Sequence, residues 1–148
     1  MLLISVKQLD GNAVLTEENH AVEKGYLCRF TSALGEGKAL LVPGAVEAAA
    51  LAGQEIMVSA RVERISGLRP LPKGEPAAPR LAALDVPGNF TATGQVRSVV
   101  WLSDEAEDAI VEVQVGPLLF SVEAGEEGAN LEYGEWVQVR LEQMTLYP

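Results

Sequence analysis

The carboxyl-terminal part of this chain has almost no basic residues. Residues 90–148 contain only Arg97 and Arg140, against eleven acidic residues, which gives a net charge of −9 out of −10 for all 148 residues. Between these two arginines there is no Lys or Arg at all. A segment of this charge repels phosphate and attracts cations or basic partners. The sequence therefore argues against a general nucleic-acid-binding protein, whose affinity rests on Lys and Arg.

The chain also has little of what catalytic and metal sites use. It holds one cysteine, Cys28, and one histidine, His20. These exclude an internal disulfide and leave too few ligands for a Cys/His zinc site. The acidic turns at 103–108 and 123–128 lack the ligand spacing of an EF-hand. There is no phosphate-cradling glycine loop and no nucleophile elbow. We predict a protein that is not an enzyme and that has no cofactor and no metal site, and whether the acidic turns bind a divalent cation stays open at this point.

The single cysteine and the amino-terminal residues bear on the compartment. Cys28 alternates with Tyr26 and Phe30 on one face of a short segment, so we expect a buried thiol. One unpaired cysteine fits a reducing compartment. The first residues are apolar but lack a basic leader, and we interpret them as a strand and not a signal peptide. No run approaches the ~18 apolar residues of a membrane span. We predict a cytoplasmic protein with no membrane partner.

The strongest positive signal is alternation of apolar and polar residues with a period of two. It occurs in four segments and is typical of strands with one buried face. Helical spacing appears once, in the alanine-rich run 45–52. The alternating segments are 26–30, 54–65, 108–115 and 136–142.

Prolines divide the chain into comparable halves. Five of them fall within 69–87, and proline lacks the N–H that a strand ladder needs. We predict an amino-terminal half at 1–68, a proline-rich linker at 69–89 and an acidic carboxyl-terminal half at 90–148. Each half shows three strands, a middle element and a long last strand. That order resembles the small Greek-key barrel called the OB-fold.

Each half is one strand short of the five of that fold unless a long strand bends. We therefore predict an all-β protein with one short helix. It consists of two small barrel-like, OB-like Greek-key halves in tandem, or of one merged barrel. Whether the halves are a true duplication stays open at this point.

A set of aromatic and basic residues suggests a surface patch in the acidic half. By parity, Trp101 and Arg97 avoid the inferred core side of the segment 90–102, and Trp136 and Arg140 avoid that of 136–142. If these strands are neighbours, the four form a patch on the outer face of the sheet. Trp and Arg are typical of interface hot spots and of platforms for stacked bases. The alternative is that the other half or the linker covers both tryptophans.

These observations favour a non-enzymatic protein-interaction module, such as an adaptor, a subunit or an acidic inhibitor of the immunity type. Its expected partner is a basic protein, and nucleic acid is not the expected ligand. The alternative is an OB-type protein that binds single-stranded nucleic acid through the Trp/Arg patch. The residues predicted to bind the partner are Trp101, Trp136, Arg97, Arg140, Asp104, Glu105, Glu107 and Asp108.

Overall fold

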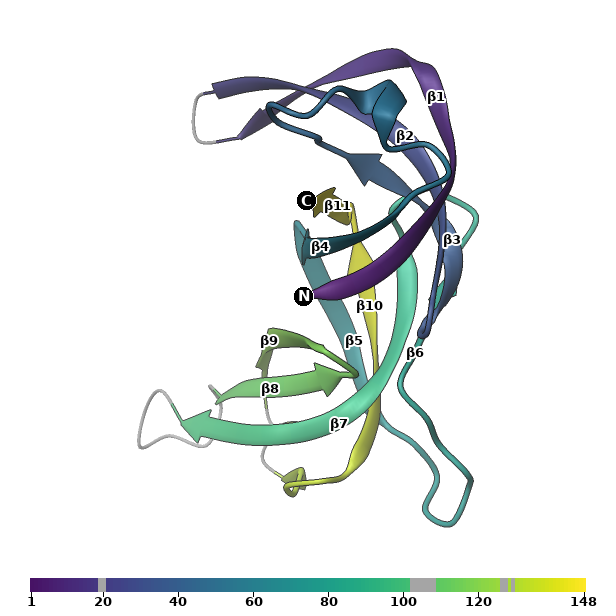
Figure 1. Ribbon diagram of the computed structural model, residues 1–148. Coiled ribbons are helices and arrows are strands. Elements are labelled where there is room, and N and C mark those ends of the chain that lie inside the picture. Colours follow the sequence, from purple (N-terminus) through teal and green to yellow (C-terminus); the bar gives the residue numbers. More distant parts are fainter. Residues whose placement is uncertain (19–20, 102–108, 126–127, 129) are drawn as a thin grey trace.

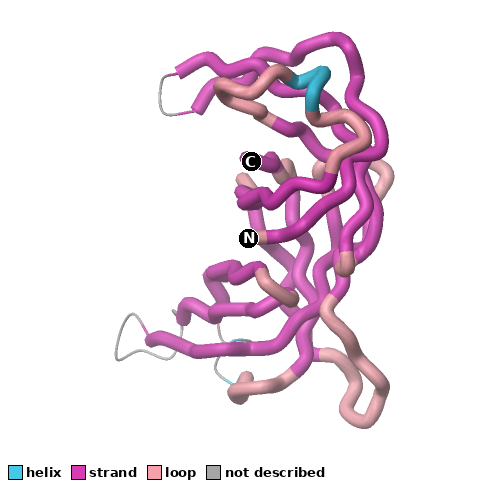
Figure 2. The backbone as a smooth tube through the Cα atoms, viewed as in Figure 1, coloured by secondary structure: helices cyan, strands magenta, loops and turns pink. Residues whose placement is uncertain are grey.

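The protein is all-β, as predicted. The structure, a computed structural model, describes residues 1–18, 21–101, 109–125, 128 and 130–148. Its strands form two units that lie one above the other, with both termini between them (Figures 1 and 2). The elements are β1 Leu2–Glu18, β2 Ala21–Ser32, β3 Gly35–Leu41, the 3-10 turn η1 Ala48–Ala50, β4 Glu55–Arg61, β5 Arg64–Pro70, β6 Arg80–Ala83, β7 Phe90–Trp101, β8 Ala109–Val115, β9 Leu118–Ala124, β10 Trp136–Glu142 and β11 Thr145–Tyr147.

The first unit is a closed five-stranded barrel. Its strand order is β1-β2-β3-β11-β4, and β4 pairs back onto β1. All pairings are antiparallel except that of β3 with β11. The carboxyl-terminal strand therefore closes a barrel made otherwise of the first 61 residues, with Leu146 completely buried inside it.

The second unit is a curled half-barrel. Its order is β5-β10-β7-β8-β9, with β6 paired to β7 beside β8, and every pairing is antiparallel. β5 and β9 stand at the two ends of this order, so no ladder closes the unit in the part of the chain that the structure describes. Its strands β7, β8, β9 and β10 come from the acidic half of the sequence.

The two units have matching strand orders and exchange one strand each. β7, β8, β9 and β10 take the places that β1, β2, β3 and β4 take in the barrel, and β5 takes the place of β11. The fifth strand that each half lacked in sequence thus comes from the other half. Pairing therefore crosses the predicted boundary at 68, because Arg64–Pro70 belongs to the ladder of β10.

Two local expectations need correction. The helix expected at 45–52 is only the 3-10 turn Ala48–Ala50, none of whose residues is buried, because alanine side chains offer too little apolar area to hold a helix against the barrel. Of the residues expected in the linker, 71–79 contain no strand, whereas 69–70 belong to β5 and Arg80–Ala83 form β6. No proline interrupts that stretch, and Leu81 packs into the core at 2% exposure.

The units share one hydrophobic core. Phe30 from β2 and Phe90 from β7 are both buried, and their ring centroids lie 6.1 Å apart. Leu81 of β6 donates its backbone N–H to the carbonyl oxygen of Leu34 at the β2–β3 turn, at 2.8 Å. Apolar burial is therefore continuous across the junction, as the exchanged strands require.

Candidate functional site

The predicted Trp/Arg residues lie on neighbouring strands but are spread along them. β7 and β10 pair antiparallel, with Trp136 opposite Gln95 and Arg140 opposite Thr91. Trp136 and Arg140 are four positions apart on one strand, about 13 Å at the usual rise. Both project from the outer face, because the core takes the alternate positions of β10.

Trp101 does not lie on that face, which corrects the prediction. The ladder between β7 and β8 shifts its register between Val96 and Ser98, so that Arg97 is the extra residue of a β-bulge. A bulge reverses the alternation beyond it. Trp101 therefore pairs with the buried Ala109 and lies on the core side at the end of the strand, where it remains 43% exposed. The four residues do not form one patch.

The acidic residues Asp104, Glu105, Glu107 and Asp108 lie outside the described residues, as does His20. Cys28 is fully buried in the barrel, as predicted, and burial raises the pKa of its thiol to about 11. A buried, protonated thiol is a poor nucleophile. Its place is therefore in the core.

A continuous outer surface covers β7, β8 and β9, and we name it the acidic face. The burial patterns of β8 and β9 alternate strictly, so their outward side chains share one side of the sheet. Three cross-strand rows follow from the register. They consist of Val100, Ile110 and Glu123; of Ser98, Glu112 and Ser121; and of Gln95, Gln114 and Leu119.

Exposed apolar side chains stand at both ends of the acidic face. Val100 is 50% exposed and Leu119 is 55% exposed, with Glu112 and Glu123 near the first of them. Trp136 extends the last row onto β10 through its pairing with Gln95. Sequence parity placed Val100 on the core side of the segment 90–102, and the bulge at Arg97 puts it on the outer face instead. Leu119 had not been singled out, because strand order was needed to bring it onto this face.

Basic residues are nearly absent from this surface. Arg97 is the single Lys or Arg between residues 81 and 139, and it is exposed at the bulge on the border of the face. Arg140 forms an ion pair within its own strand, in which its Nε lies 3.0 Å from Oε1 of Glu142. β8 and β9, which carry most of the acidic face, contain no Lys or Arg.

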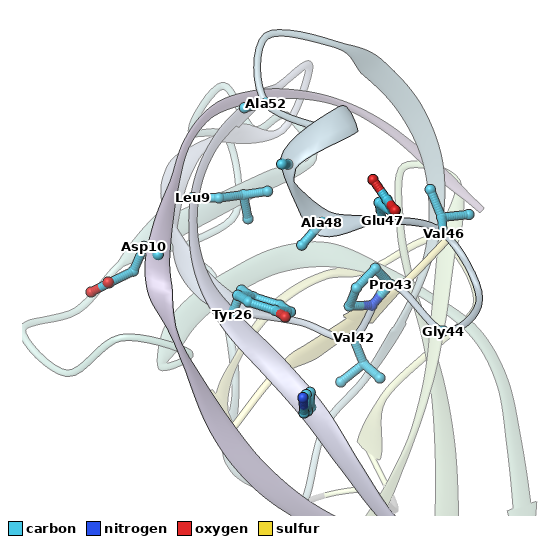
Figure 3. A pocket seen from close by; sticks show the side chains of 13 residues that line it. Leu9, Asp10, Tyr26, Val42, Pro43, Gly44, Val46, Glu47, Ala48 and Ala52 are labelled. Carbon is cyan, nitrogen blue, oxygen red and sulfur yellow. The ribbon is translucent and has the colours of Figure 1, made fainter.

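A separate pocket opens at the far end of the barrel (Figure 3). It has a volume of about 930 Å³ and lies between the β1–β2 hairpin and the segment 42–52. Leu9, Tyr26 and Val42 contribute to its walls, and Lys24 and Glu47 also line it. Charges of both signs at this pocket select no ligand class, and no sequence pattern pointed to it.

Comparison with models of protein families, with curated proteins and with solved structures finds no match. In the described part of the chain, no helix has the length and hydropathy to cross a membrane. The same residues contain no group of three or more His, Cys, Asp or Glu placed to hold a metal ion.

Proposed function

We propose that this protein is a non-enzymatic interaction module that binds a basic protein segment through the acidic face. The observation that carries the proposal is the combination on one sheet of two carboxylates, Glu112 and Glu123, with exposed apolar side chains. Neither carboxylate is in an ion pair within the part of the chain that the structure describes. Interfaces gain affinity from apolar side chains that lose water and gain specificity from charge complementarity. A cytoplasmic location belongs to the same proposal.

The two kinds of residue have separate roles. The carboxylates raise the rate at which a cationic partner arrives, an effect that salt screens. Leu119, Val100 and Trp136 then supply contacts that slow dissociation. Adaptor, subunit and acidic inhibitor are three settings in which such a surface is used, and the proposal covers all three.

The experiment uses a fluorescent lysine-rich peptide as the probe. We expect the wild-type protein to bind it, with an association rate that falls as salt rises. The double variant Glu112→Lys/Glu123→Lys should bind at least about tenfold more weakly, because close charge pairs across interfaces are worth more than 1.4 kcal/mol. Leu119→Ala should raise the dissociation rate and leave the association rate nearly unchanged.

Glu55→Lys is the matched control for the single reversals Glu112→Lys and Glu123→Lys, because all three change the net charge by the same amount. Glu55 is exposed on β4 of the barrel, away from the acidic face, so its reversal should leave binding unchanged. Equal loss with this control would show that only net charge matters and would end the proposal. Binding of a single-stranded oligonucleotide in place of the peptide, abolished by Trp136→Ala, would support the nucleic-acid alternative instead.

A further inference from the structure

A second groove lies where the barrel meets the second unit. Its volume is about 610 Å³, within the range of small-molecule sites. One side is the outer surface of β2 and β3, and the other is the connection from β6 to β7. The backbone N–H of Gly88 donates to the carbonyl oxygen of Lys38 at 2.7 Å and fixes the two sides to each other.

Three cations from adjacent strands line this groove. Arg29 of β2 lies directly opposite Lys38 of β3, and Lys7 occupies the register shift of β1 between Val6 and Gln8, beside Arg29. All three are exposed and all three line the groove. Within the described residues, none of them is in an ion pair.

The pairing of Arg29 with Lys38 is unfavourable for the isolated protein. Side chains directly opposite each other on antiparallel strands have Cβ atoms about 5 Å apart, and like charges there destabilise the sheet. Two arginines of the second unit have partners on their own sheet. Arg69 donates to Oε1 of Gln138 at 2.7 Å, and Arg140 meets Glu142. A bound anion would offset the repulsion in the groove.

The remaining walls fit a compact ligand with a polar and an apolar part. Thr31 supplies a hydroxyl, and Asn89 an amide whose Oδ1 already accepts a hydrogen bond from the backbone N–H of Gln143 at 3.1 Å. The NH₂ group of Asn89 is thus the part of its side chain that can donate a hydrogen bond to an anion. Leu84 and Pro87 form an apolar wall. The groove is also lined by two acids, Glu36 and Asp85, which accept hydrogen bonds from a ligand and disfavour a ligand that is anionic throughout.

We propose that this groove binds a phosphate group, carried by a ligand of about nucleotide size. Arg29, Lys38 and Lys7 surround the phosphate, and the apolar wall receives the ligand's uncharged body. Arg and Lys are the usual partners of phosphate, with Arg able to bind two oxygens at once. The site is separate from the acidic face and does not depend on the proposed function.

The test is calorimetric titration of the whole protein with three kinds of probe: pyrophosphate, adenosine monophosphate and single-stranded oligothymidylates of increasing length. We expect saturable one-to-one binding of pyrophosphate or the mononucleotide at low salt. Arg29→Gln and Lys38→Gln should each weaken the binding of this ligand at least about tenfold. The reason is that each variant loses a hydrogen bond to a charged group, whose free energy corresponds to more than a tenfold change in Kd. Lys38→Arg should retain binding. Affinity that grows with oligonucleotide length would identify a nucleic-acid strand as the source of the phosphate, and a plateau at the mononucleotide would identify a free metabolite.

Lys24→Gln is the matched control, because Lys24 is an exposed lysine of the same barrel that lines the other pocket. Its binding should equal that of the wild type. Without ligand, Arg29→Gln and Lys38→Gln should melt at or above the wild-type temperature, which separates lost binding from lost folding. Absence of saturable binding overturns the proposal, as do unchanged affinities in these variants or equal competition by oligoglutamate.

Discussion

The two units share a strand order but differ in closure. In the barrel, β11 pairs with both β3 and β4, and its parallel pairing with β3 spans only Thr145 and Leu146. In the half-barrel, β5 pairs with β10, but no described ladder joins it to β9. A closed sheet has no free edge, whereas an open one presents unpaired backbone groups. The barrel is thus closed by β11, a strand of only three residues. The half-barrel has no corresponding ladder between β5 and β9 among the described residues.

The exchange of strands makes each unit depend on the other for its completion. Each unit receives its fifth strand from the other half after a connection of two residues, 62–63 or 143–144. Neither half of the sequence therefore contains a complete unit. The shared core leads to the same expectation, because Phe30 and Phe90 pack across the junction. We expect the two units to unfold together.

The largest effect should follow from deleting residues 144–148, which removes the strand that closes the barrel. Met144 is 1% exposed and Leu146 is fully buried, and loss of each such side chain costs about 2–5 kcal/mol. Together these losses approach the ~5–15 kcal/mol that holds a typical domain folded. We expect the cooperative thermal transition to be lost in both units. Near-ultraviolet circular dichroism, recorded as the temperature rises, measures this transition.

Deletion of the exposed Pro148 alone is the control and should leave the melting temperature unchanged. Survival of a cooperative transition within a few degrees of the wild type after the larger deletion would show that closure by β11 is dispensable. The two units would then differ less in stability than their topology suggests.

The alternation of apolar and polar residues predicted several of the strands but not which strands pair with each other. Alternation in 54–65, 108–115 and 136–142 identified strands, because it reflects which side chains meet the core. It carries no information on which strand pairs with which, so the exchange of β5 and β11 was not predictable from one half at a time. Arg97 illustrates the limit for the site. Its bulge has no side-chain signature, and one extra residue moved Trp101 to the other face.

A second, smaller effect is expected from Gly94→Val, which acts on the open unit. A Cβ at Gly94 would lie 2.8 Å from Cγ2 of Val115 and against the backbone carbonyl of Gln114. β7 and β8 would have to separate, at a cost of about 1–3 kcal/mol for overpacking. Both tryptophans belong to this unit, so their fluorescence reports its unfolding by denaturant.

Gly11→Val is the matched control. Gly11 is exposed on β1 of the barrel, and no heavy atom lies within 4 Å of an added Cβ, so its effect should stay within about 0.5 kcal/mol. If Gly94→Val shifted the tryptophan transition while the barrel unfolded at its usual denaturant concentration, the units would be independent. The expectation of one shared transition would then be wrong.

The smallest effect concerns Cys28, which reports on the barrel alone because it is the single cysteine. The thiol is fully buried, and burial raises its pKa from 9.0 to about 11. Between these values the unfolded chain loses the proton while the folded protein keeps it. Stability is therefore fully present below pH 9.0 and falls as the pH rises toward about 11. A pKa difference of one unit corresponds to about 1.4 kcal/mol.

Comparing wild type with Cys28→Ala across this range isolates the contribution of the thiol, because other titrating groups are common to both proteins. We expect the free energy of unfolding to decline more steeply for the wild type above pH 9.0. At neutral pH a thiol reagent should label the native protein far more slowly than the denatured one, and slow labelling should persist in Gly94→Val if the barrel stays closed. Parallel pH profiles, or rapid labelling of the native wild type, would show that the barrel opens far more readily than a closed sheet with a fully buried Cys28 should.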